Sequence, residues 1–216
     1  MHSSEASACA TNDINKMLEK YNSLGYTGII LTNHFFNGNT CVPRNMSWRN
    51  KIELFLLPYE KAKIKAKEYD MDIFWGFEYN YYGTEFLIYG IDKEFLIKHP
   101  EIMSLTLSEF INLVHENNGI VIHAHPFREA SYIRETRLFP ELTDAVEVIN
   151  GSLVGTNFND KAKTYSEKYN LPQTAGSDSH STNHSRFCGM EFQHRLKNIN
   201  DFILSIRNRE YSLFLI

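Results

Sequence analysis

The sequence predicts an α/β barrel with a largely parallel sheet. Short apolar runs rich in β-branched residues alternate with longer stretches of helical period, which is the pattern of repeated βα units. Histidines and acids stand at the ends of several runs, where the active sites of parallel barrels are assembled. The length of 216 residues and the hydrophobic content of 43% suit one domain over residues 1–216.

Six apolar runs are expected to form the strands, and the C-terminal end can add one more. The runs are 28–34, 73–78, 85–91, 119–125, 145–149 and 173–178, with residues 212–216 as the terminal addition. Helices are expected over 13–24, 47–69, 158–169 and 200–209. A further helix should begin at Thr106, because Thr106 and Glu109 have the spacing of a capping box, and should stop at Gly119.

The charge balance bears on the kind of partner. A formal net charge of −4 and a pI of about 6.1 do not favour a nucleic-acid partner. A small anionic substrate, neutralised by bound metal, fits better. No run is apolar enough for a membrane span and no signal peptide is visible, so we expect a cytoplasmic protein.

The three cysteines are few and far apart in the sequence. Cys9, Cys41 and Cys188 do not form the pattern of a disulfide framework, which favours a reducing compartment. We interpret all three as inert, buried or half-buried thiols.

Candidate metal ligands follow four of the predicted strands. They are His34, Glu78, His125, Asp178 and His180. Because the C-terminal ends of parallel strands meet at one mouth of a barrel, these side chains should share a site. Imidazole and carboxylate are ligands that suit zinc, manganese and iron.

Residues two apart on a strand face the same side, so His123 should accompany His125, and His180 should accompany Asp178. His123 is therefore a candidate either for metal binding or for supporting the ligands. The remaining histidines lie on predicted loops or helices, where we expect solvated or packing roles. They are His99, His115, His184 and His194.

At these positions the sequence resembles the PHP superfamily, named for polymerases and histidinol phosphatases. The matching stretches are residues 1–4, 32–35, 76–78, 124–128 and 176–180. The resemblance implies a distorted seven-stranded barrel that binds up to three metal ions. The ligands that it implies are His2, His34, Glu78, His125, Asp178 and His180.

The sequence departs from the family pattern at two places. Met1 occupies the middle of the opening His-x-His motif, so that the first histidine and most of the first strand are expected to be absent, through a late start or because the chain is a fragment. Asn33 replaces the aspartate of the family's Thr-Asp-His, which should affect the orientation of His34 without removing it.

Two further acids have open roles. Glu85 stands where some family members place a histidine, and is either a carboxylate ligand or a solvated strand end. Glu5 is close enough to His2 in sequence to reach a metal ion, or is an exposed acid.

The predicted function is hydrolysis of a small phosphate ester by hydroxide that two or three divalent ions (zinc, manganese or iron) generate from water. Arg128 is expected either to bind the phosphate or to form a surface salt bridge. Arg128 and His123 are the candidate catalytic residues.

The sequence leaves two alternative functions open. Amidohydrolase-like barrels also open with His-x-His, although they usually need a longer chain and often a modified lysine. A weakened barrel that binds metal without turnover would fit the missing histidine and Asn33.

Overall fold

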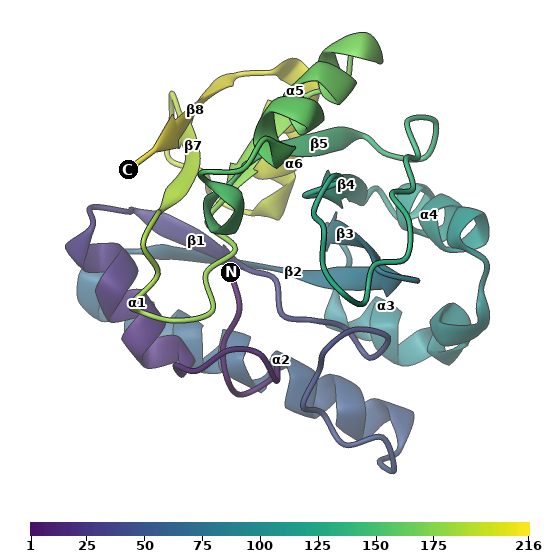
Figure 1. Ribbon diagram of the computed structural model, residues 1–216. Coiled ribbons are helices and arrows are strands. Elements are labelled where there is room, and N and C mark those ends of the chain that lie inside the picture. Colours follow the sequence, from purple (N-terminus) through teal and green to yellow (C-terminus); the bar gives the residue numbers. More distant parts are fainter.

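The computed structural model describes residues 1–216 as a curled sheet with helices packed around it (Figure 1). Six strands form the main sheet in sequence order, and two more form a separate antiparallel pair. The main strands are β1 (Gly28–Leu31), β2 (Asp72–Tyr81), β3 (Thr84–Tyr89), β4 (Ile120–Ala124), β5 (Ala145–Asn150) and β6 (Gln173–Gly176). The antiparallel pair consists of β7 (Cys188–Phe192) and β8 (Tyr211–Leu215).

The sheet is mixed, whereas the sequence predicted a largely parallel one. β3 runs antiparallel to both β2 and β4, while the β1–β2, β4–β5 and β5–β6 pairs are parallel. The reversal occurs at Tyr82 and Gly83, which both have positive φ (52° and 91°) and join Tyr81 directly to Thr84. Two left-handed residues in a two-residue loop form a tight hairpin turn, so no helical crossover is needed here. A Tyr-Gly pair is a weaker sequence signal for this turn than Asn-Gly, and it was not recognised.

The seven strands of the expected distorted barrel are not confirmed. β1 and β6 are the two ends of the six-stranded sheet, and no ladder of hydrogen bonds joins them. A cavity of about 720 Å³ lies in this region, lined by residues of β1, β6 and β7. The architecture is thus an α/β half-barrel, and its curled sheet is consistent with a distorted barrel.

The helices surround the sheet in the order of the chain (Figure 1). They are α1 (Ile14–Ser23), α2 (Trp48–Lys65), α3 (Lys93–Lys98), α4 (Leu107–Glu116), α5 (Phe158–Lys168) and α6 (Ile199–Asn208). The capping box at Thr106 is present, with the hydroxyl accepting from Glu109 N and the carboxylate accepting from Thr106 N. The short α3 and strand β7 were not predicted, because elements of five or six residues carry too little periodicity.

The main core lies between the sheet and α2 to α4. It contains several fully buried aromatic side chains: Phe35, Phe55, Phe77, Phe86 and Phe110. This packing holds β2, β3 and β4 in register and so fixes the edge of the sheet at which the candidate site is built. None of the helices combines the length and the apolar character needed to cross a bilayer.

Candidate metal centre

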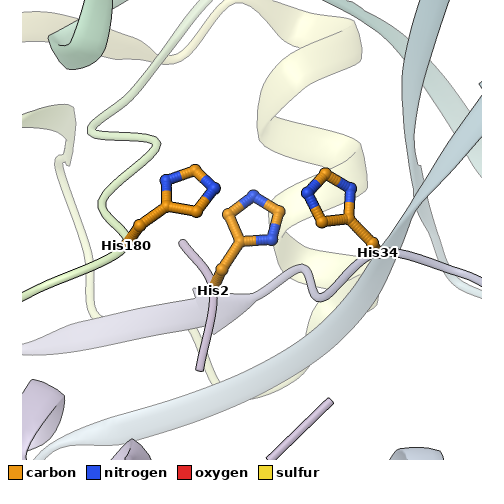
Figure 2. Close-up of side chains that lie close together, drawn as sticks. All are labelled: His2, His34 and His180. Carbon is orange, nitrogen blue, oxygen red and sulfur yellow. The ribbon is translucent and has the colours of Figure 1, made fainter. Parts of the chain in front are cut away.

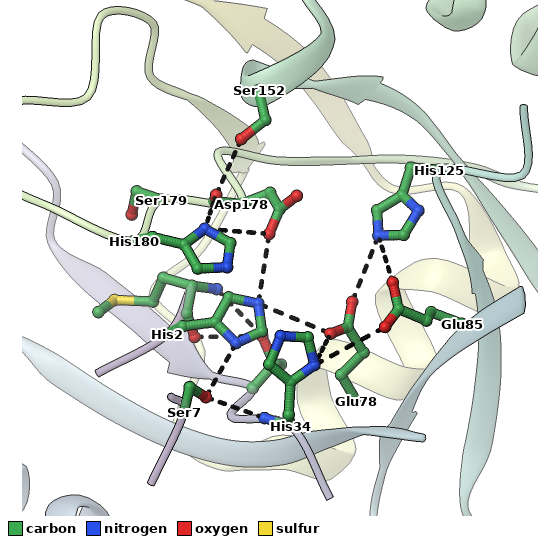
Figure 3. Close-up of polar contacts among 12 residues, drawn as sticks. His2, Ser7, His34, Glu78, Glu85, His125, Ser152, Asp178, Ser179 and His180 are labelled. Atoms are coloured by element: carbon green, nitrogen blue, oxygen red, sulfur yellow. Dashed lines mark hydrogen bonds and ion pairs between the residues drawn. The ribbon is translucent and has the colours of Figure 1, made fainter. Parts of the chain in front are cut away.

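Six of the predicted ligands converge on one buried cluster at the edge of the sheet (Figure 3). They come from the N-terminal segment, from the ends of β1, β4 and β6, and from the middle of β2. They are His2, His34, Glu78, His125, Asp178 and His180, of which all but His180 are buried. Residues spread over most of the chain therefore share one small volume.

The distances between these side chains are short. Glu78 is at the centre, with Oε2 2.6 Å from His34 Nδ1 and Oε1 3.3 Å from His125 Nε2. His2 Nε2 lies 3.2 Å from Asp178 Oδ1. The ring of His2 is 4.4 Å from that of His34 and 4.4 Å from that of His180 (Figure 2).

Two overlapping groups of donor atoms result. His2, His34 and His180 offer nitrogen atoms that all lie within 4.8 Å of one another, and so do the donor atoms of His34, Glu78 and Glu85. His34 belongs to both groups. The geometry is therefore compatible with neighbouring ions that share a ligand.

Strand pairing brings His34 beside Glu78. The parallel pairing of β1 with β2 continues past the end of β1, through hydrogen bonds from Phe35 N to Glu78 O (2.8 Å) and from Glu78 N to Asn33 O (3.0 Å). Glu85 reaches the same edge for a different reason. Because β3 is antiparallel, its first residues lie beside the last residues of β4, and Glu85 pairs with Ala124.

Two of the ligands have backbone conformations that are unusual for residues with a side chain. His125 has φ of 28° and Asp178 has φ of 49°. Left-handed non-glycine residues cost free energy and often occur at functional sites. At both strand ends the positive φ breaks the alternation of the strand and turns the side chain toward the cluster.

Hydrogen bonds fix the tautomer of His2. Asn33 Oδ1 accepts from Ser3 N (2.7 Å) and from Ser7 Oγ (2.9 Å). Since the Ser7 proton goes to Asn33, Ser7 Oγ accepts from His2 Nδ1 (3.2 Å) and from His34 N (3.0 Å). His2 therefore presents the lone pair of Nε2 to Asp178, an arrangement that calls for a cation between the two acceptors.

A hydrogen bond also fixes the tautomer of His180. Its Nδ1 donates to the carbonyl oxygen of Asp178 at 2.8 Å, which leaves the lone pair on Nε2. Neutral imidazoles with a free Nε2 and ionised carboxylates are the forms in which these residues bind divalent metal. The donor set thus fits a metal centre.

The pKa values of the buried side chains also bear on metal binding. Burial alone would lower the pKa of His34, but the charge of Glu78 and contacts with Cys9 raise it to about 11. Burial lowers the pKa of His2 to about 3, so that this ring is neutral. Burial also raises the pKa of Glu85, with the charge of Glu78 adding to the effect. In the metal-free protein, protons held by His34 and His125 balance part of the buried negative charge, and a bound cation would take over this role.

Three buried atoms of the cluster lack a hydrogen bond of acceptable geometry. They are His34 Nδ1, Glu78 Oε2 and Glu85 Oε2. His34 Nδ1 and Glu78 Oε2 are close, yet their angles are poor for a hydrogen bond. Orphaned buried polar atoms that face one another are expected where an ion completes the site.

A comparison with protein families gives a match to part of the chain. Residues 156–211 match a family model described as PHP-associated, and the matched segment contains Asp178 and His180. The predicted PHP-superfamily resemblance is confirmed. No curated protein matches the chain.

Solved structures share the fold of this chain at low sequence identity. The first is a two-domain protein containing a predicted PHP-like metal-dependent phosphoesterase from Bacteroides vulgatus ATCC 8482, with a TM-score of 0.73 and 14% identity. The match covers 99% of this chain but only 62% of that one, so the chain spans less than two thirds of its relative. A putative metal-dependent phosphoesterase from Bifidobacterium adolescentis ATCC 15703 has a TM-score of 0.56 and 13% identity, over 94% and 93% of the two chains. PsfC from Pseudomonas syringae PB-5123 has a TM-score of 0.61 and 15% identity, over 93% and 81%.

His123 is not part of the cluster, although the sequence placed it on the same side as His125. Its ring stacks on Phe86 (centroids 5.1 Å apart) and lies near Phe139 and Tyr165, on the face of the sheet that α5 covers. The positive φ of His125 breaks the alternation on which the expectation rested. Both ring nitrogens of His123 are buried without a partner, and burial lowers the pKa to about 3.

Glu5 also lies apart from the two donor groups. Its carboxylate accepts from Ile14 N, with both oxygens at 3.2 Å, and therefore caps the start of α1. Arg128, in contrast, does reach the cluster, with Nη1 3.4 Å from Asp178 Oδ2. Glu85, whose role was open, is buried within the second donor group.

The sequence reasoning missed several residues around the cluster. Glu147 Oε2 accepts from His125 N (3.1 Å) and from Asn150 Nδ2 (2.8 Å), and burial together with the charge of Asp178 raises its pKa to about 7. Glu147 alternates with apolar residues in β5, so an acid on the inner face of that strand was the available signal.

Divalent metal should stabilise the fold through Glu78. At a metal concentration of 100 Kd, we expect the free energy of unfolding of the wild type to rise by about 2.7 kcal/mol. Glu78→Gln keeps the shape of the side chain but removes its charge, and a tenfold loss of affinity would reduce the gain to about 1.4 kcal/mol. Urea denaturation with and without zinc or manganese measures both values. Glu60→Gln, at an exposed acid of α2, should behave as wild type, and an equal gain in Glu78→Gln would contradict the site.

Replacing His123 should affect stability and not catalysis. His123→Phe removes two buried nitrogens without partners and keeps an aromatic ring against Phe86, so the free energy of unfolding should increase by about 1 kcal/mol. His123→Ala should lower it by about 3 kcal/mol through the cavity it leaves. Thermal or urea denaturation gives the stabilities. Normal folding of His123→Phe with a tenfold loss of metal affinity or activity would instead give His123 a part in the site.

Proposed function

We propose that the chain hydrolyses a phosphate ester of a small molecule in a metal-dependent reaction. The observation that carries the proposal is the convergence of six metal-binding side chains on one buried cluster, with Arg128 at its border. Two of the structural neighbours are named as metal-dependent phosphoesterases, which supports the general reaction class.

The ligands would divide between the two donor groups. The first group offers the donors of His2, His34 and His180, and the second offers those of His34, Glu78 and Glu85. His125 contacts the carboxylates of Glu78 and Glu85, and Asp178 contacts the imidazole of His2. Bound divalent ions would lower the pKa of water and neutralise the oxygens of the phosphoryl group. The protein itself fixes the donors, through strand pairing and through the tautomers set by Ser7 and by the Asp178 carbonyl.

Arg128 is placed to bind the phosphate. Its guanidinium is partly buried, with the side chain 27% exposed, and its contact with Asp178 is long at 3.4 Å. A guanidinium in a loose contact can turn to an incoming phosphate and form two parallel hydrogen bonds with it. We therefore assign Arg128 to substrate binding.

A small substrate fits the charge of the molecule better than a polynucleotide does. The net charge is −4, and a polyanion needs a row of cationic side chains along its backbone. Amidohydrolase-like chemistry and metal binding without turnover would use similar donors. No lysine lines the cavity that borders Glu78 and Asp178, which weighs against the first, and Asn33 still supplies the oxygen that orients Ser7, which weighs against the second.

Hydrolysis of p-nitrophenyl phosphate should depend on metal and on Asp178. Chelation should abolish turnover, and manganese or zinc should restore it. Asp178→Asn should lower kcat/KM at least about 100-fold, or 2.7 kcal/mol, because it removes a charged donor beside His2. Full turnover by the metal-free protein would refute the proposal, and turnover of cyclic amides alone would favour the amidohydrolase alternative.

Arg128 should act mainly on substrate affinity. Arg128→Ala should raise KM and lower kcat/KM by 10- to 100-fold, as expected for loss of about 1.5–3 kcal/mol from a charge-assisted hydrogen bond. Arg128→Lys should recover part of the loss, because it keeps the charge but not the two-pronged geometry. Steady-state kinetics on a phosphate monoester measure both. Arg134→Ala, at an exposed arginine of the same loop, is the matched control, and equal kinetics for all variants would show that Arg128 forms only a salt bridge.

A further inference from the structure

Glu147 and Asn150 form a buried pair of side chains beside the metal centre. Glu147 is 4% exposed, and Asn150 is fully buried. Asn150 Nδ2 donates to Glu147 Oε2 at 2.8 Å, and the same oxygen accepts from His125 N at 3.1 Å. Both residues line the cavity that also borders Glu78, His125 and Asp178. Glu147 belongs to neither donor group, so its place here calls for another role.

An irregularity in β5 brings the two side chains together. In a regular strand, residues three apart face opposite sides of the sheet. Here Glu147 pairs with Thr174, whereas Ile149 pairs with the very next residue, Ala175, so that β5 contains one extra residue. Such a bulge reverses the alternation beyond it and often redirects a side chain near a functional site. Asn150 therefore faces the same side as Glu147.

The orientation of the Asn150 side chain is fixed by its neighbours. Asn150 Oδ1 accepts from Ser152 N at 3.0 Å, so Nδ2 is the atom directed at the acids. Asn159 holds the backbone on both sides, since its Oδ1 accepts from Asn150 N and its Nδ2 donates to Asn150 O. Asn150 Nδ2 also lies 3.4 Å from Asp178 Oδ2. This contact leaves Asp178 Oδ1 free to face His2 Nε2, at 3.2 Å.

The pair connects the two ligands that have a strained backbone. His125 and Asp178 have φ of 28° and 49°, which are conformations that persist only where surrounding contacts enforce them. Glu147 accepts the N–H of His125, and Asn150 contacts the carboxylate of Asp178. The two ligands follow different strands, β4 and β6, so a link between them through β5 fixes how far apart their donor atoms lie.

We propose that Glu147 is a positioning residue, which together with Asn150 holds His125 and Asp178 in the geometry that metal binding requires. The inference rests on the metal chemistry proposed above. Glu147 acts as a hydrogen-bond acceptor, because both of its hydrogen bonds end on Oε2. An amide oxygen can accept the same two bonds, so the negative charge is not needed for this task. A metal ligand or a general base at this position would need that charge.

Two substitutions of Glu147 separate these roles. Calorimetric titration of the metal-free protein with Mn²⁺ measures metal affinity, and amide hydrogen exchange followed by NMR measures the protection of His125 N–H without any metal. Glu147→Gln should leave both little changed. Glu147→Ala should remove the protection, because His125 N loses its acceptor, and should weaken Mn²⁺ binding at least about tenfold. Its kcat/KM for p-nitrophenyl phosphate should fall in parallel.

Two further variants test the pair and control for general loss of stability. Val148→Ala, at a buried residue of β5 that packs with Ala162 and Tyr165 of α5, should lower stability but not Mn²⁺ affinity. Asn150→Ala should weaken Mn²⁺ binding, and Glu147→Ala with Asn150→Ala should lose less than the sum of the single effects, because the pair acts as one unit. Circular dichroism checks that each variant is folded.

The positioning role and the metal centre fail in different ways. An equal loss of Mn²⁺ affinity in Glu147→Gln and Glu147→Ala would overturn the positioning role, since the charge itself would then matter. Unchanged affinity in Glu147→Ala, or a comparable loss in Val148→Ala, would overturn it as well. Absence of Mn²⁺ and Zn²⁺ binding by the wild type would instead overturn the proposed function, whatever the exchange of His125 N–H shows.

Discussion

The structure depends on one electrostatic constraint, which is the burial of several carboxylates in a small volume. Glu78, Glu85, Glu147 and Asp178 are all at most 7% exposed. An unpaired charge in such surroundings costs several kcal/mol, and two like charges a few ångströms apart cost more. Of the four neighbouring imidazoles, His34 and His125 offset this by holding protons at raised pKa values. The tautomers of His2 and His180 instead leave lone pairs directed into the cluster. A divalent cation satisfies the acids and the lone pairs at the same time.

The fold supplies the ligands by three separate devices. Parallel strand ends bring in His34 and Asp178, as the sequence predicted. The antiparallel β3 delivers Glu85 from the start of a strand, because reversing a strand exchanges which of its ends lies at a given edge. Positive φ at His125 and Asp178 then redirects side chains that regular strands would point elsewhere. The strain is localised at the ligands, where the free energy of metal binding would offset it.

Features with a strong local sequence signal were predicted, and features that depend on a weakly marked turn or on a single dihedral angle were not. The six strands of the main sheet and the capped helix after Thr106 were predicted with bounds that differ by at most three residues, because alternating apolar runs and capping residues are local signals. The direction of β3 was missed, since it depends on a two-residue turn with little sequence signature. The face of His123 was misjudged because one dihedral angle at His125 overrides the parity of the strand.

Asn33 illustrates how a departure from a family pattern can leave the chemistry intact. The family aspartate at this position would offer carboxylate oxygens, and the amide of Asn33 offers one oxygen that accepts from Ser3 N and Ser7 Oγ. Its Nδ2 donates to Ser3 Oγ at 3.2 Å, so both polar atoms of the amide have partners within the protein. The direction of the Ser7 hydroxyl, and with it the tautomer of His2, needs only that one acceptor. A neutral residue performs this task and adds no further negative charge to a cluster already crowded with acids, which makes the substitution electrostatically favourable rather than a sign of decay.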